Sequence, residues 1–256
     1  MEENYNNKNM KRFKLLSVAL VVLFAVSLFS SCNTDDGYKI GDIYPTALVT
    51  VKPYPDSSGC FLQLDNTTTL YPTNLKGLPY GPTPVRALIE YLSVDDDPKD
   101  CDSAVKIVRM KEIITKQPVQ HGTMTAEELG NDPLEIVKDW RTLVEDGFIT
   151  LRFRTMSSGI GITHYLHLVA GVNPENPYEL HLCHNAYGDV AGELADGLIA
   201  FDLSSLPSSS NPEQTIKLVW ESFSGKKSAE FLLYGDSTTG AGSVQVSEMP
   251  STLKVE

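Results

Sequence analysis

Residues 46–51, TALVTV, open a run of five short apolar segments that decides the fold of the first half of the chain. Each segment alternates or is rich in β-branched residues, and turn signals such as Pro53 and Asp65-Asn66 separate them, which is typical of strands. Five strands in about 70 residues, with a long Pro/Gly-rich loop between them, predict a small closed barrel such as an OB-fold. The other four segments are CFLQL at 60–64, TTTLY at 67–71, RALIEYL at 86–92 and AVKIVRMKEII at 104–114.

The second half of the chain carries another set of short strand patterns. Apolar and polar side chains alternate in residues 147–155, and the segments 163–170 and 178–184 flank a loop like the two arms of a hairpin. Regular short strands with turn signals favour an immunoglobulin-like β-sandwich, so the whole chain is expected to be all-β. Residues 133–145, around Trp140, form the one piece with helical or turn-rich character. Further strands are expected at 197–203, 215–222 and 227–234.

The beginning of the chain has the order of a lipoprotein signal peptide. The basic segment Lys11-Arg12-Phe13-Lys14 is followed by an apolar run at 15–29 and then by Ser30-Ser31-Cys32. The apolar run is too short for a transmembrane helix, which needs about 20 residues, and it ends in small residues and a cysteine. We therefore expect cleavage before Cys32 and lipid on that residue, which would anchor the protein to a membrane.

Several residues around this signal refine the prediction. Phe29 stands where the usual lipobox has Leu, Val or Ile, and the polar residues 1–9 leave Met10 as an alternative start to Met1. The acidic patch Asn33-Thr34-Asp35-Asp36-Gly37 resembles the surface-export tether of Bacteroidetes lipoproteins. This resemblance favours an outer-membrane lipoprotein that faces outward, with a periplasm-facing one as the alternative.

The charge of the chain bears on its partners. The formal net charge is −12 at pH 7, so binding of nucleic acid through phosphate neutralisation is not expected. The acidic excess lies mainly after Pro118, where we place a domain boundary. The predicted plan is a signal peptide at 1–31, an acidic tether at 32–41, an OB-like barrel at 42–117, a β-sandwich at 118–236 and a flexible tail at 237–256.

Three cysteines remain besides Cys32. Cys60 and Cys101 fall in the same predicted domain, and disulfides persist in the compartment that the signal peptide indicates. A bridge between them is one prediction, although spacing alone does not establish the geometry that a disulfide needs. Cys183 would then be the odd cysteine, a buried thiol.

The hairpin histidines are the main candidates for a metal site. If the hairpin loop is centred on residue 174, His164 faces His184 and His167 faces His181, with Cys183 diagonal to His167. Histidine and cysteine side chains on one face of a hairpin could share a zinc or copper ion. A register slip of one residue would remove that site, and ordinary half-buried strand residues are the favoured interpretation. Because no helix end would activate the Cys183 thiol, a Cys/His nucleophile is disfavoured as well.

Other patterns are weaker. The acidic loop 95–102 has many carboxylates but lacks the ordered spacing of a calcium loop, so a solvated hairpin loop is favoured. The sequence has no Gly-x-Ser-x-Gly, P-loop, His-Glu-x-x-His or dinucleotide-binding motif. We therefore assign no catalytic, cofactor or metal residue. Aromatic side chains of the barrel form either a binding platform or part of its core, the core being favoured; they are Phe61, Tyr71, Tyr80 and Tyr91.

Dispersed short matches make the chain similar to the NigD-like lipoproteins of Bacteroidetes. The resemblance implies an N-terminal OB-like domain and a C-terminal β-sandwich, and it implies little about activity. The family name comes from a bacteriocin gene cluster in which an immunity role was suggested. The matching positions are Cys32, Asp35–Asp42, Leu64-Asp65, Leu70-Tyr71-Pro72, Arg86, Tyr91, Ile113–Lys116 and His184–Asp189.

Taken together, these patterns indicate a surface-anchored, non-catalytic binding or accessory lipoprotein. Its partner is expected to be a protein or a glycan at the cell surface, and no cofactor is expected. Two other functions stay open at this point. One is a metal-dependent hydrolase that uses the hairpin histidines, and the other is a structural subunit of an outer-membrane complex.

Overall fold

The structure is a computed structural model that describes residues 46–234 and residue 255. These residues belong to one unit that runs from Ile43 to Glu256. Cys32 and the predicted signal peptide and tether lie outside the described residues, as does the predicted tail apart from Val255. Among the described residues, no helix is long and apolar enough to cross a membrane.

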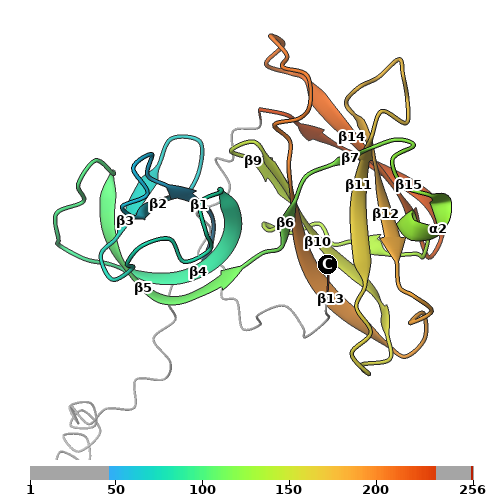
Figure 1. Cartoon of the computed structure of the whole chain (residues 1–256), viewed down its shortest axis with the longest axis horizontal. Helices are drawn as coiled ribbons and strands as arrows, with labels where there is room; N and C mark the ends of the chain where they lie inside the picture. The colour runs from blue at the N-terminus through green and yellow to red at the C-terminus, as the bar shows by residue number, and fades with distance from the viewer. Residues whose placement is uncertain (1–45, 235–254, 256) are drawn as a thin grey trace, which may run out of the picture. The chain divides into compact units, whose positions relative to one another are not determined.

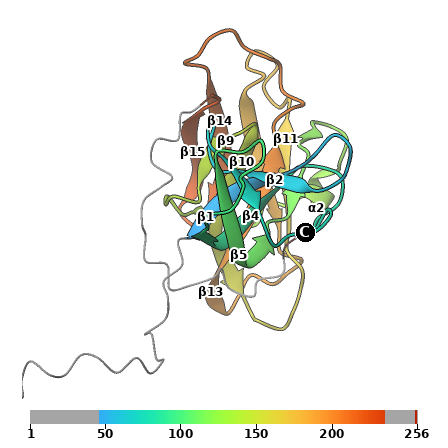
Figure 2. The same cartoon turned by 90° about the vertical axis from the view of Figure 1, so that its left-hand side faces the viewer.

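The first half of the chain folds into the closed five-stranded barrel that its strand pattern predicts (Figure 1). Its strands join in the order β1-β2-β3-β5-β4, and β3 runs parallel to β5. Figure 2 shows β1, β2, β4 and β5 after a turn of 90°. Alternate side chains of β1, namely Ala47, Val49 and Val51, fill the barrel, because successive residues of a strand point to opposite faces. The strands are β1 (Thr46–Pro53), β2 (Cys60–Gln63), β3 (Thr69–Pro72), β4 (Val85–Ser93) and β5 (Ser103–Glu112).

The second half forms two sheets that face each other as a β-sandwich (Figure 1). The first sheet has the order β6-β13-β10-β8, with β9 also paired to β10, and the second has the order β15-β14-β12-β11-β7. The strands of the first sheet are β6 (Thr115–Lys116), β8 (Glu135–Ile136), β9 (Leu143–Glu145), β10 (Phe148–Ser157) and β13 (Glu193–Asp202). Those of the second are β7 (Val119–Gln120), β11 (Tyr165–Ala170), β12 (Glu179–Asn185), β14 (Thr215–Ser222) and β15 (Gly225–Leu232).

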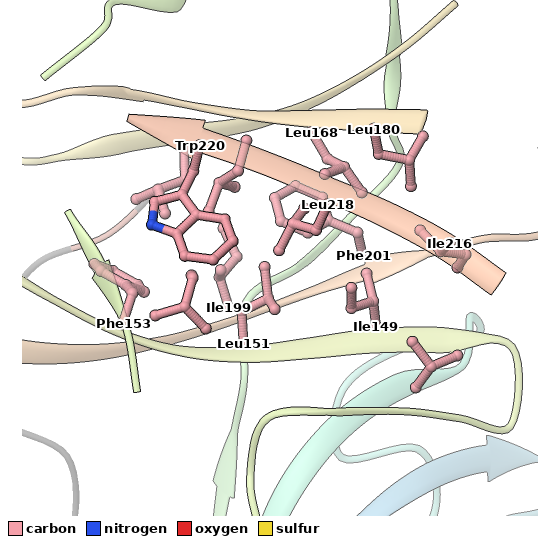
Figure 3. Packing of buried hydrophobic residues seen from close by; sticks show 14 of the residues in the cluster. Ile149, Leu151, Phe153, Leu168, Leu180, Ile199, Phe201, Ile216, Leu218 and Trp220 are labelled. Atoms are coloured by element: carbon pink, nitrogen blue, oxygen red, sulfur yellow. The ribbon is translucent and has the colours of Figure 1, made fainter. Parts of the chain in front are cut away.

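The core of the sandwich lies between the two sheets, as Figure 3 shows. Apolar side chains at every second position of β10 point inward and meet side chains of β14 and β12 from the opposite sheet. Trp220 packs among them with 5% of its surface exposed. This alternation is the reason why the sequence pattern of β10 predicts a sandwich strand. The β10 and β14 residues labelled there are Ile149, Leu151, Phe153, Ile216, Leu218 and Trp220.

The outer side of barrel strands β1 and β4 is buried as well. Leu48 and Leu88, which point away from the barrel interior, form an apolar cluster with Ile113 and with Ala200 of the sandwich. This second buried face explains why β1 and β4 read as nearly continuous apolar runs rather than as alternating strands.

Residues 133–145 are turn-rich around Trp140, as one of the two expectations had it, and not helical. The segment contains the short strands β8 and β9 joined by turns. The one helix of the described residues is α2 (Ala126–Leu129), which Thr125 and Glu128 start with a reciprocal capping box. The pattern Thr-x-x-Glu at 125–128 is a sequence signal from which this helix could have been predicted.

Candidate functional site

A cleft of about 720 Å³ opens on the barrel. The turn that follows β1, the end of β3 and the loop between β4 and β5 supply its walls. Pro53 and Pro55 help to end β1 there, since proline cannot continue a strand ladder. The side chains that line the cleft are mixed in character, with aromatic and apolar groups beside charged ones. They include Tyr54, Tyr71, Pro72, Leu75, Lys76, Lys99 and Asp100.

Tyr54 is held firmly at the wall of this cleft. Its backbone N–H donates to the carbonyl of Gly59 at 2.9 Å, and its ring lies against Phe61 with centroids 5.6 Å apart. Burial, followed by the neighbouring Cys101 thiol, raises the pKa of Tyr54 to about 12. The shift leaves the Tyr54 hydroxyl protonated at neutral pH, as in an ordinary tyrosine.

The acidic loop 95–102 brings Lys99 and Asp100 to the cleft. Its carboxylates serve the loop itself: the Asp97 side chain accepts from the Lys99 backbone N–H at 2.9 Å and from Lys99 Nζ at 3.0 Å. Asp102 accepts from the backbone N–H of Thr69 at 2.7 Å and thereby ties the loop to β3. The carboxylates therefore hold the turns of the loop, which agrees with the expected solvated loop. The loop also places the Lys99 cation and the Asp100 anion beside Tyr71 in the cleft.

The predicted aromatic platform is only partly present. Tyr71 lines the cleft, and Phe61 packs against Tyr54, which lines it as well. Tyr80 and Tyr91 instead pack against the barrel core. Sequence reasoning missed Tyr54, which lies between two prolines and outside any strand pattern. Tyr54 directly follows β1, and its ring contact with Phe61 depends on the register of β1 with β2, in which Phe61 is opposite Lys52.

The expected register of the β11–β12 hairpin is wrong. His167 pairs with Cys183 and His181 pairs with Val169, so that the hairpin is centred one residue later than expected. The displacement keeps His167, Cys183 and His181 on one face, but His181 Nε2 lies 3.2 Å from the Glu179 carboxylate. Within residues 46–234, no three His, Cys, Asp or Glu side chains form a group that could hold a metal ion.

The described cysteines are free thiols in the structure. Cys60 is buried, and Cys101 and Cys183 are half-buried. Burial raises the pKa of the Cys60 and Cys183 thiols, which makes both poor nucleophiles at neutral pH. The Cys60–Cys101 bridge stays a prediction, which alkylation of the purified protein under non-reducing conditions would test.

Comparison with known domains fits this architecture. Residues 48–113 match the model of the NigD-like N-terminal OB domain, and residues 116–233 match that of the NigD-like C-terminal beta sandwich domain. The chain belongs to the NigD-like family. Both matched ranges agree with the barrel and the sandwich, and a search of curated proteins gives no match for this NigD-like protein.

Three solved structures share the fold of this NigD-like chain. A provisionally named toxin-related protein of Parabacteroides distasonis is 26% identical, with a TM-score of 0.62, and the match covers 75% of this chain and 94% of that one. A NigD-like immunity protein of Bacteroides caccae is 20% identical, with a TM-score of 0.52 and coverage of 76% and 93%. A provisionally named lipoprotein of Bacteroides fragilis is 13% identical, with a TM-score of 0.50 and coverage of 73% and 97%.

Proposed function

We propose that this NigD-like protein is a surface-anchored, non-catalytic binding lipoprotein whose barrel cleft binds a saccharide of a surface or secreted glycan. The observation that carries the proposal is the lining of the cleft, where Tyr54 and Tyr71 lie beside Lys99 and Asp100. Anchoring rests on the signal-peptide pattern that ends at Cys32, and it would hold the cleft where extracellular glycans are present.

The chemistry of the lining suits a neutral polar ligand with apolar faces. A tyrosine ring offers an apolar face and a hydroxyl, so two tyrosines can pack against the C–H face of a sugar and bond to its hydroxyl groups. The Tyr54 hydroxyl is protonated at neutral pH, as that of an ordinary tyrosine is, and can donate a hydrogen bond. Lys99 adds a donor and Asp100 an acceptor, which gives the few polar groups that orient a ligand in such a cleft.

A binding role is favoured over catalysis for a related reason. A general base works best with a pKa near the working pH, and the Tyr54 hydroxyl in this cleft titrates far above it. The relatives described as an immunity protein and as toxin-related agree with an accessory role. A protein ligand is the other partner class that such names suggest, and the binding experiment separates the two classes.

The test is a saccharide-binding screen with the chain from residue 33 onward, followed by capture from intact cells. Saccharide binding that Tyr71→Ala weakens at least ten-fold and Tyr187→Ala leaves unchanged would support the proposal. Tyr187 is the matched control, because it is an exposed tyrosine of the sandwich. If no saccharide binds and a protein is captured whose binding requires Tyr71, the ligand of the cleft is a protein and not a saccharide. If Tyr71→Ala binds the saccharide as well as the unmodified chain does, the binding site is not this cleft.

A further inference from the structure

Two histidines and two aspartates form a buried hydrogen-bonded chain in the sandwich. Asp189 Oδ2 lies 3.1 Å from His164 Nε2, His164 Nδ1 lies 2.9 Å from His184 Nε2, and His184 Nδ1 lies 3.2 Å from the backbone carbonyl of Asp132. His164, His184 and Asp189 are 0%, 1% and 3% exposed. Water cannot satisfy these ring nitrogens, so each of the three contacts needs one proton between its two atoms.

The Asp132 end of the chain fixes one proton. A backbone carbonyl can only accept, so His184 Nδ1 must carry a proton and donate it. Between His164 Nδ1 and His184 Nε2, one nitrogen must donate and the other must accept. Burial, followed by the neighbouring charge of His164, lowers the pKa of His184 to about 4, so His184 is neutral and His164 Nδ1 is the donor.

The Asp189 end fixes the remaining proton. The Asp189 carboxylate accepts from the Ser158 backbone N–H at 2.8 Å and from the Ser157 hydroxyl at 3.0 Å. These donors, with His164, hold the pKa of Asp189 well below its ordinary value, so that the group is ionised. An ionised carboxylate only accepts, and His164 Nε2 must therefore be protonated.

We propose that the buried His164–His184 pair holds three ring protons and one positive charge, which Asp189 keeps on His164, and that this extra proton clamps the end of the sandwich. Removal of the proton would leave one of the three contacts with two facing acceptors. The proposal concerns a conformational device and is independent of the cleft on the barrel. Asp132 and Asp189 are the charged groups that face the two rings from the elements packed against them.

The clamp joins residues from both sheets of the sandwich and from its loops. His184 is the penultimate residue of β12, Asp189 belongs to the loop that leads to β13, and Ser157 ends β10 in the opposite sheet. Asp132 reinforces the same place, since its carboxylate accepts from the Ala186 backbone N–H at 2.8 Å and its own N–H donates to the His184 carbonyl at 2.8 Å. The backbone beside His164 also pairs in parallel with Val255 near the C-terminus.

The test reads the ring protons directly, by nitrogen–proton correlation spectra of histidines in the ¹⁵N-labelled chain from residue 33 onward at pH 7. Three ring protons on the His164–His184 pair are expected, with His184 protonated only at Nδ1. In Asp189→Asn, an uncharged side chain of the same shape can donate to His164 Nε2, so two ring protons are expected. Asp202→Asn is the matched control and should keep three. Two protons in the unmodified chain, or three in Asp189→Asn, would overturn the proposal.

The clamping role has its own readout. The backbone N–H of Asp189 donates to the Ala186 carbonyl at 2.9 Å, and its hydrogen exchange reports opening of the loop. As pH is raised, the exchange rate of the Asp189 backbone N–H, corrected for base catalysis, should increase at least ten-fold. The increase should occur over the pH range in which the His164–His184 pair loses its third ring proton. Asp189→Asn, which has no such proton to lose, should show no step over that range. Loss of the proton without a change in exchange would refute the clamp.

Discussion

Arg86 Nη2 of barrel strand β4 lies 2.9 Å from Glu145 Oε2 of sandwich strand β9, and both side chains are buried. The Arg86 guanidinium also donates to the hydroxyl of Thr50 at 2.8 Å and to that of Thr150 at 3.3 Å. Barrel and sandwich therefore share one satisfied buried ion pair. Removing one partner leaves the other charge buried without compensation, which costs more than the pair contributes as a whole.

We predict that Arg86→Ala destabilises the protein by about 3–5 kcal/mol, because the buried Glu145 carboxylate loses the guanidinium that pairs with it. The double variant Arg86→Met/Glu145→Met, which removes both charges, should lose less. Urea unfolding measures both free energies. Lys227→Ala is the control, since Lys227 pairs with Glu135 at the surface and its loss should change stability by about 0–1 kcal/mol. A double variant as unstable as Arg86→Ala would contradict this account.

The stability of the protein should fall as the pH is lowered, over a range that the folded and unfolded pKa values of His184 set. The pKa of His184 is lowered to about 4 in the folded protein, whereas an unfolded histidine titrates near about 6.5. Between these values the unfolded chain binds one more proton at this site, so the contribution is complete above pH 6.5 and is lost as pH falls towards 4. The loss amounts to about 3 kcal/mol.

Urea unfolding between pH 7.5 and 4.5 measures this slope. His184→Gln should flatten it, while His121→Gln, at an exposed position, should leave it unchanged. An equal slope in His184→Gln and in the unmodified chain would assign the pH dependence to other groups.

Gly197 permits the close approach of Phe153 across the β10–β13 ladder. A Cβ atom at Gly197 would lie 2.4 Å from Cζ of Phe153, a ring that is 0% exposed. Gly197→Ala should therefore destabilise the protein by about 1–3 kcal/mol through overpacking, as measured by urea unfolding. Gly59→Ala is the control, because its Cβ would make only ordinary contact with Tyr54 at 3.8 Å. Equal stability of the two variants would count against this packing.

Strand periodicity predicts most of the fold because each main strand buries a continuous face. The short strands β8 and β9 have two and three residues, too few for a period to appear. The burial of Arg86 could not be predicted, since it follows from Glu145, Thr50 and Thr150 converging from other strands. Sequence alone thus predicts local elements better than the partners that they meet.

The candidate sites show the same division. The strand pairing expected between His164 and His184 is wrong, since His184 pairs with Leu166, but the two side chains still meet at 2.9 Å. The contact of Asp189 with His164 was missed because a loop side chain has no periodic signal. The segment His184–Asp189, which supports the family resemblance, begins with His184 and ends with Asp189. Both side chains contact His164, which is a structural role for these two positions. Tyr54 was missed for the same reason as Asp189, since it lies in a turn.

The most direct test of the account is the affinity of the cleft for the best saccharide from a glycan screen, measured by titration calorimetry on the unmodified chain and on Tyr71→Ala. A ring that packs against a sugar should contribute enough that its removal weakens binding at least ten-fold, about 1.4 kcal/mol. Tyr187→Ala should bind as the unmodified chain does. Equal affinity of Tyr71→Ala and the unmodified chain, with both folded, would contradict the central claim that this cleft is the binding site.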